Sequence, residues 1–188
     1  MSHALLHLQE VARLALKIPH QDIEKLADEL IQLRQRQGWL YIVGLGGSAG
    51  NASHMAADFR KLCRLQAYSM DNIPEITARA NDEGWPTIFD GFLNSISGKD
   101  ALFVLSVGGG TPQVSLPLVK AIDKAKSVNA MILGIVGPNG GYTYEHGDCV
   151  IRVPCEIEQT PHTEAFQAVI WHLLCCHPLL QRQATKWV

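Results

Sequence analysis

The spacing of apolar residues predicts helical structure at the start of the chain. Between Leu5 and Arg36, apolar residues recur every three or four positions, which is the period of one helix face. Pro19 interrupts this stretch, and an internal proline breaks the helical hydrogen-bond ladder, so we expect two helices or one broken helix. This amphipathic segment can serve as an oligomer face or pack on the core of its own chain, and the pattern alone does not decide between them.

The remaining chain alternates short apolar runs with glycine-rich turns and helical stretches. Four runs predict buried strands: 39–43, 101–105, 131–136 and 149–153. The last helix is expected over Thr163–Leu180, and Pro112 suits the first turn of the helix that follows the second glycine turn. Strands that alternate with helices predict an α/β fold with a doubly wound parallel sheet, whose ligands lie beyond the carboxyl ends of the strands.

Composition narrows the classes of function. The chain has 188 residues, of which 47% are hydrophobic and 18% charged, with a formal net charge of −2. This is the profile of one globular domain with a full core, and it offers no basic field for nucleic acid. No run approaches the length of a membrane span, so we expect neither a nucleic-acid nor a membrane partner. The five cysteines match no disulfide or zinc-knuckle spacing, which favours reduced thiols in a cytoplasmic protein.

Two glycine-rich turns are candidates for an anion site. Gly44–Ser48 follows the first predicted strand, and Ser106–Thr111 follows the second. Such turns expose backbone N–H groups, and a helix that starts there adds its positive end. Ser48, Ser106 and Thr111 add hydroxyl donors. A glycine turn can also be a mere tight connection, and neither turn has the G-x-G-x-x-G or P-loop pattern, so nucleotide and sugar phosphate both stay open.

Imidazoles and carboxylates occur at two helical spacings. His54 and Asp58 are four residues apart, which places them on one helix face. Glu164 and His172 are eight apart, which corresponds to ~12 Å along a helix. These groups are suitable ligands for Zn²⁺, although a surface His–Asp pair and a core histidine account for the same residues.

Together, these motifs resemble the phosphoheptose isomerase branch of the SIS family. The resemblance rests on Gly-x-Gly-Gly-Ser at 44–48, on His54 with Asp58, on the Ser/Gly/Thr turn at 106–111, and on Asn81–Asp82. It also includes the Thr160–Pro161 entry to the last helix. The resemblance implies one flavodoxin-like SIS domain over 1–188, with a five-stranded sheet. It also implies that residues 1–37 form a helical oligomerisation segment and that the protein is a homotetramer with sites shared between subunits.

The resemblance also implies a set of site residues. The substrate and phosphate ligands fall on Gly47, Ser48, Asn81, Asp82, Ser106, Gly108 and Thr111. An Asx turn before Gly84 is an alternative account of Asn81–Asp82. One zinc ion per active site would be held by His54, Asp58, Glu164 and His172, where Asp58 replaces the usual Glu and Glu164 the usual Gln. Asp58 and His172 would be the acid–base pair, with Glu164 as a stand-in base.

The implied activity is a metal-assisted ketose–aldose isomerisation of a sugar phosphate, with sedoheptulose 7-phosphate giving a heptose 7-phosphate. Leu45 replaces the usual Asn, and Val107 and Gly108 fall in a second turn that lacks two of the family's hydroxyls. Each lost charge-assisted hydrogen bond weakens phosphate binding by ~1.5–3 kcal/mol. Two alternatives therefore stay open: an isomerase for a different phosphosugar, and a non-catalytic SIS protein that binds sugar phosphate or a replication-initiator protein.

Overall fold

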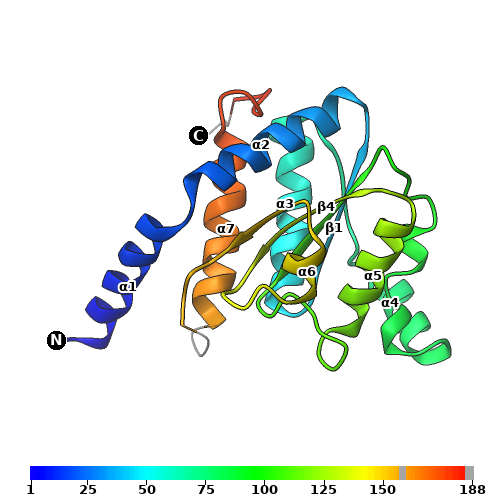
Figure 1. Ribbon diagram of the computed structural model, residues 1–188, viewed down its shortest axis with the longest axis horizontal. Coiled ribbons are helices and arrows are strands. Elements are labelled where there is room, and N and C mark those ends of the chain that lie inside the picture. The colour runs from blue at the N-terminus through cyan, green and yellow to red at the C-terminus, as the bar shows by residue number, and fades with distance from the viewer. Residues whose placement is uncertain (157–159, 185–188) are drawn as a thin grey trace.

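The chain folds around a parallel sheet that carries helices on both faces (Figure 1). The computed structural model describes residues 1–156 and 160–184. The sheet has five strands in the order β2-β1-β3-β4-β5. The strands are β1 (Trp39–Gly44), β2 (Gln66–Ser69), β3 (Ala101–Ser106), β4 (Met131–Val136) and β5 (Cys149–Arg152). This confirms the predicted doubly wound α/β fold.

The helices divide between the two faces of the sheet. They are α1 (His3–Lys17), α2 (His20–Gln35), α3 (Gly47–Cys63), α4 (Ile73–Asp82), α5 (Leu116–Ser127), α6 (Gly141–His146) and α7 (Thr160–Cys176), with short 3-10 turns at Trp85–Thr87 and Gly91–Leu93. Helices α2, α3 and α7 pack on one face through a core that includes Leu40, Ile42 and Phe103. Alternate strand residues such as Tyr41 and Leu102 point to the other face, toward α5. The central strands β1, β3 and β4 are therefore apolar on both sides, which is why they read as continuous apolar runs.

The two N-terminal helices differ in what they contact. Helix α2 buries Ile23, Leu26 and Leu30 in the core, whereas α1 extends away from the sheet (Figure 1). Helix α1 ends before Ile18 and α2 begins at His20, so the predicted break at Pro19 is confirmed. No helix in residues 1–156 and 160–184 has the length and apolar character needed to cross a membrane.

The structure corrects the predictions in three places. Strand β2 has no counterpart among the predicted runs, because an edge strand that pairs only with β1 does not need a continuous apolar sequence. Pro112 does not begin a helix; α5 starts at Leu116, and Pro117 occupies its first turn. Helix α7 runs from Thr160 to Cys176, so it starts three residues and ends four residues earlier than expected.

The strand order places a ligand site at the centre of the sheet. From β1 the chain moves to β2 on one side, and then crosses to β3 on the other side of β1. In a doubly wound sheet, the crevice at such a switch point is where ligands bind. The loops after β1 and β3 are the two glycine-rich turns, so they meet at this crevice.

Candidate active site

The two glycine-rich turns line one cavity at the carboxyl ends of β1 and β3. Its volume is ≈ 240 Å³, and its walls include Ser48 from the first turn and Ser106, Gly108 and Thr111 from the second. Glu164 of α7 completes the wall. The structure therefore brings the predicted phosphate-binding residues of both turns together. Leu45 and Val107, the two apolar departures in these turns, line the same cavity.

The hydroxyl groups in this cavity are oriented by hydrogen bonds that they accept. The side-chain amide of Gln167 donates to Ser48 Oγ at 3.1 Å. The backbone N–H of Gly109 donates to Ser106 Oγ at 3.0 Å, and that of Val114 donates to Thr111 Oγ1 at 2.9 Å. A hydroxyl that accepts from the protein still has its own O–H to donate. Ser48 and Ser106 are thereby suited to donate to an anion.

A buried polar network fixes the first turn of α3 to α7. Gln167 is fully buried and connects Ser48 to Asn51, whose side-chain amide donates to Gln167 Oε1 at 2.9 Å. Asn51 also donates to the backbone carbonyl of Glu164 at 3.0 Å. Asn51 is not among the site residues predicted from the sequence. Its position three residues before His54, on the same helical face, was the available signal.

A second cluster of chemically active groups lies where α3 contacts α7. Asp58 Oδ2 is 3.6 Å from His54 Nε2 and 3.9 Å from His172 Nε2. The three ligand atoms all lie within 4.8 Å of one another. Ligands at ~2.0–2.2 Å from one tetrahedral ion lie ~3.3–3.6 Å apart, so both His–Asp distances are close to those of a metal site. An inward movement of the two exposed imidazoles would let the three atoms hold a divalent ion such as Zn²⁺. The side chains of His54 and His172 are 61% and 50% exposed, which leaves the cluster open to a substrate.

A hydrogen bond made by Nδ1 of His172 shows which ring nitrogen carries a proton. His172 Nδ1 lies 2.8 Å from the backbone carbonyl of Ala168. A carbonyl only accepts, so Nδ1 carries a proton, and Nε2 is the ring nitrogen that faces Asp58 and is left to bind a metal ion. Hydrogen bonding of the second nitrogen to a carbonyl is typical of histidines that bind metal ions. The buried Trp171 ring lies against His54, with centroids 4.7 Å apart, and forms an apolar wall of the cluster.

Glu164 lies apart from this three-residue cluster. A Cβ added to Gly47 would meet the Glu164 carboxylate oxygen Oε2 at 2.5 Å, so the carboxylate lies against the first residue of α3. Helices α3 and α7 run side by side in the same direction, since Glu164 is next to Gly47 and His172 is next to His54. The structure thus brings together three of the four predicted metal ligands. Glu164 lies about two turns away, beside the glycine turns.

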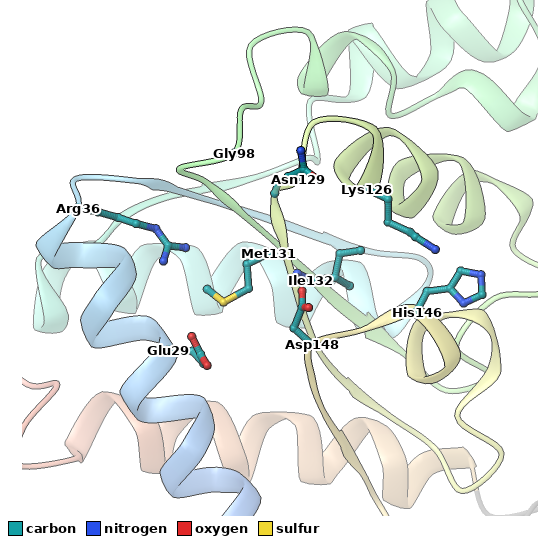
Figure 2. A pocket seen from close by; sticks show the side chains of 10 residues that line it. Glu29, Arg36, Gly98, Lys126, Asn129, Met131, Ile132, His146 and Asp148 are labelled. Carbon is teal, nitrogen blue, oxygen red and sulfur yellow. Dashed lines mark hydrogen bonds between the residues drawn. The ribbon is translucent and has the colours of Figure 1, made fainter.

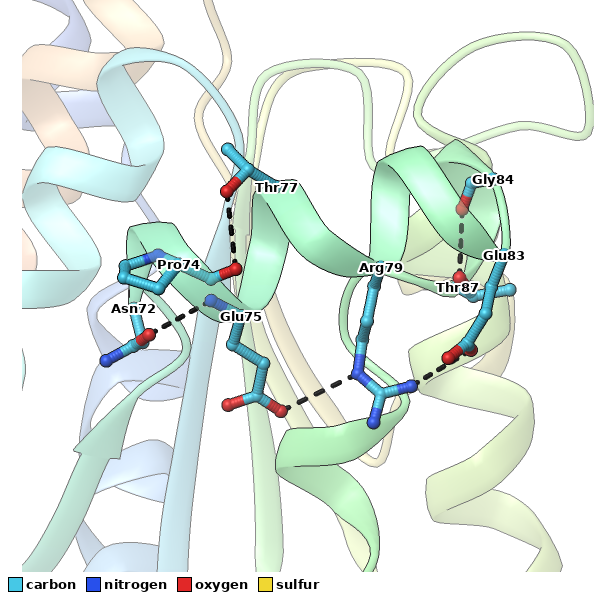
Figure 3. A network of polar contacts seen from close by, with 8 residues as sticks. All are labelled: Asn72, Pro74, Glu75, Thr77, Arg79, Glu83, Gly84 and Thr87. Carbon is cyan, nitrogen blue, oxygen red and sulfur yellow. Dashed lines mark hydrogen bonds and ion pairs between the residues drawn. The ribbon is translucent and has the colours of Figure 1, made fainter.

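Asn81 and Asp82 lie at the end of α4, and both are exposed. Asn81 Nδ2 donates to Asp82 Oδ1 at 2.7 Å. Helix α4 is held by Asn72, whose side chain accepts from the backbone N–H of Glu75 (Figure 3). Arg79 pairs with Glu75 at 3.6 Å and with Glu83 at 3.0 Å. Neither Asn81 nor Asp82 lines the two-loop cavity within the described part of the chain, so their predicted sugar contacts stay a prediction.

A larger cavity lies at the other end of the sheet, near the amino ends of the strands. It measures ≈ 550 Å³ and lies near the amino end of β4, with Arg36, Lys126 and Asp148 in its wall (Figure 2). Arg36 Nε donates to the Lys99 carbonyl, and Asp148 accepts from the backbone N–H of Ile132, so both charges already support the fold. Because ligands in this architecture bind at the carboxyl ends of the strands, we assign the site to the smaller cavity and its neighbouring cluster.

The chain is similar in sequence to phosphoheptose isomerases. No protein-family model matches the chain. A phosphoheptose isomerase from Helicobacter pylori is 33% identical over 153 residues, which cover 78% of this chain and 77% of that protein. A phosphoheptose isomerase from Helicobacter hepaticus is 31% identical over 177 residues, which cover 90% and 86%.

Solved structures share the fold. A phosphoheptose isomerase from Neisseria gonorrhoeae superposes with a TM-score of 0.83 at 23% identity, covering 92% of this chain and 95% of that one. A phosphoheptose isomerase from Francisella tularensis has the same TM-score at 19% identity, covering 94% and 97%. At these identities the superpositions establish the architecture, and the sequence relatives carry the family assignment.

Proposed function

The chain belongs to the phosphoheptose isomerase family, and we propose that it interconverts sedoheptulose 7-phosphate and a heptose 7-phosphate. The observation that carries this proposal is the placement of two sites along α3. The two-loop cavity lies at its first residue, and His54 and Asp58 follow two to three turns later, beside His172. Seven residues of helix rise ~10 Å, a span suited to a sugar chain with phosphate at one end and reacting carbons at the other.

The phosphate end is assigned to the glycine turns. Ser48 and Ser106 present O–H donors, and the neighbouring Gly47 and Gly108 are exposed. Thr111 accepts from Val114, and its weaker contact to the Val114 carbonyl, at 3.5 Å, is easily exchanged for a ligand oxygen. The start of α3 adds the positive end of its dipole to this region.

The reacting end is assigned to the three-residue cluster. Isomerisation moves a proton between adjacent carbons through an enediol, and this requires an acid–base pair at the two carbons. Asp58 and His172 are that pair: the Ala168 carbonyl holds His172 with Nε2 directed at Asp58. His54, Asp58 and His172 would hold one zinc ion, which supplies charge for the developing oxyanion. For Glu164, the roles of fourth ligand and stand-in base stay predictions.

We further propose that the protein works as a homotetramer in the cytoplasm, with sites shared between subunits. Helix α1 extends from the fold and exposes Leu5, Leu6 and Leu8 (Figure 1). Apolar side chains on a projecting helix favour burial against other copies. Sharing between subunits would also allow Asn81 and Asp82 to reach the site of another subunit. A solution mass near 20.7 kDa by light scattering would contradict this assembly.

A turnover assay tests the activity. Purified protein should convert sedoheptulose 7-phosphate, and His172→Gln should abolish this conversion, because the variant lacks the imidazole beside Asp58. His20→Gln is the matched control, since His20 is exposed at the start of α2. Unchanged turnover in His172→Gln would remove His172 from catalysis. A panel of phosphosugars tests the alternative substrate that Val107 and Gly108 suggest, and the non-catalytic alternative is disfavoured by the isomerase relatives.

A further inference from the structure

Glu164 places a negative charge inside the cavity assigned to the substrate phosphate. Its carboxylate lies against Gly47 at the start of α3, and it shares the cavity wall with Ser48 and Ser106. A helix N-terminus with hydroxyl donors is a favourable place for an anion. The position that free phosphate would take beside the first turn is therefore already next to a carboxylate of the chain.

The carboxylate of Glu164 is not neutralised by the surrounding protein. Within residues 1–156 and 160–184, no side-chain hydrogen bond or ion pair reaches it, and no lysine or arginine lines the cavity. Like charges a few ångströms apart repel strongly in a partly buried site, where water screens them poorly. A small anion that enters the cavity therefore meets repulsion from Glu164 together with attraction from the N–H and O–H donors.

A sugar phosphate meets a different balance of forces. A carboxylate is only an acceptor, so charged phosphate oxygens gain nothing from it, whereas sugar hydroxyls can donate to it. A ligand that carries hydroxyls next to its phosphate can place them against Glu164. Its phosphate then lies at the second turn, near the hydroxyl groups of Ser106, Thr111 and Ser115, which line the same cavity.

We propose that Glu164 is a specificity-determining residue that rejects inorganic phosphate and other small anions and admits phosphates that carry sugar hydroxyls. The inference rests on the proposed function only in taking the two-loop cavity as the phosphate site. It concerns the selection of the ligand and leaves the proton transfer to Asp58 and His172.

Calorimetric titration of the purified protein tests this role. The probes are inorganic phosphate and an open-chain alditol phosphate, which has hydroxyls and a phosphate but no carbonyl to isomerise. In Glu164→Gln the repulsion disappears while the shape of the side chain is kept, so phosphate should bind about tenfold more tightly. The affinity for the alditol phosphate should rise less, because its hydroxyls also lose the charged Glu164 carboxylate that accepts their hydrogen bonds. The preference for the alditol phosphate over phosphate should therefore fall.

A matched control separates local charge from net charge. Glu145→Gln removes one negative charge from the exposed surface of α6 and should leave both affinities unchanged. Equal or weaker phosphate binding in Glu164→Gln would overturn the proposal, as would an equal gain in Glu145→Gln. Glu164→Ala gives the same reading of phosphate affinity if the glutamine variant does not fold.

The outcome is independent of the turnover assay. Wild-type turnover of sedoheptulose 7-phosphate, with phosphate affinity unchanged in Glu164→Gln, would refute charge selection and keep the isomerase. Tighter phosphate binding in Glu164→Gln, without wild-type turnover of any phosphosugar, would refute the isomerase and keep the selecting role of Glu164.

Discussion

The side-chain amide of Gln167 on α7 donates a hydrogen bond to the hydroxyl of Ser48 on α3, at 3.1 Å. Ser48 is 2% exposed and Gln167 is fully buried, so this bond lies out of water. It joins the first glycine turn to the helix that carries both Glu164 and His172. The first glycine turn, which lines the phosphate cavity, and the His–Asp–His cluster are thereby held by the same pair of packed helices.

Removing this bond should destabilise the fold. Gln167→Leu leaves Ser48 Oγ and the Asn51 amide without their buried partner, which costs ~1–3 kcal/mol in the free energy of unfolding. Urea denaturation measures the change. In the background of Ser48→Ala the same substitution should cost less, because one of the orphaned groups is already absent. Strictly additive effects in this double-mutant cycle would show that the two side chains do not interact.

Zinc should bind at the three-residue cluster and be reported by Trp171. The Trp171 ring lies against both His54 and His172, so ion binding should change the indole emission. Asp58→Asn and His172→Gln should each weaken zinc binding at least about tenfold, since each loses a ligand.

The zinc affinity of Glu164→Gln tests whether the three-residue cluster alone holds the ion or whether Glu164 is a fourth ligand, as predicted from the sequence. If the three-residue cluster alone holds the ion, the zinc affinity of this variant stays near that of the wild type, because Glu164 lies beside Gly47 and outside the cluster. A loss as large as that of Asp58→Asn would place Glu164 among the ligands. Metal analysis that finds no zinc after reconstitution of the wild type would exclude the whole set.

Replacement of two neighbouring glycines in the second turn by alanine should affect the stability of the fold to different extents. Gly109 has a φ of +72°, and an added Cβ would collide with the carbonyl oxygen of Gly140. Gly109→Ala should therefore lower the free energy of unfolding by ~1–3 kcal/mol. Gly108 has no atom within 4 Å of such a Cβ, so Gly108→Ala should unfold at nearly the wild-type temperature. Equal melting temperatures for the two variants would contradict this account of the turn.

The cysteines should differ sharply in their reactivity toward alkylating agents. Cys63, Cys149, Cys155 and Cys175 are buried, whereas Cys176 is exposed. Burial raises the pKa of the Cys149 thiol to about 11, so it stays protonated and unreactive at neutral and mildly alkaline pH. Iodoacetamide should label Cys176 rapidly in the folded protein and the other four only after unfolding, as peptide mass spectrometry can show. Fast labelling of Cys149 below its pKa would indicate local opening of the fold.

Much of the architecture followed from local patterns. Continuous apolar runs identified β1, β3 and β4 because these central strands are covered on both faces, and Pro19 marked the break between α1 and α2. The shorter run of β5 was also recognised, although this edge strand has a half-buried Val150 and an exposed Arg152. Strand β2 was missed because Gln66 and Ser69 lie at a sheet edge, where burial demands little of the sequence. The start of α5 was misplaced because Pro112 and Pro117 both suit a first turn, and only the path of the second glycine turn selects between them.

The sequence by itself determined which chemical groups the protein has at its site and the family to which they point. The spacing of His54 and Asp58 is enough to place them on one helix face. The glycine-rich sequences at 44–48 and 106–111 indicate the two turns. The tertiary structure decided which groups meet. His172 joins His54 and Asp58 because α3 and α7 run side by side in the same direction, and that parallel packing carries Glu164 to Gly47. Spacing along one helix cannot report its alignment with another, because that alignment depends on side chains packed across the whole core.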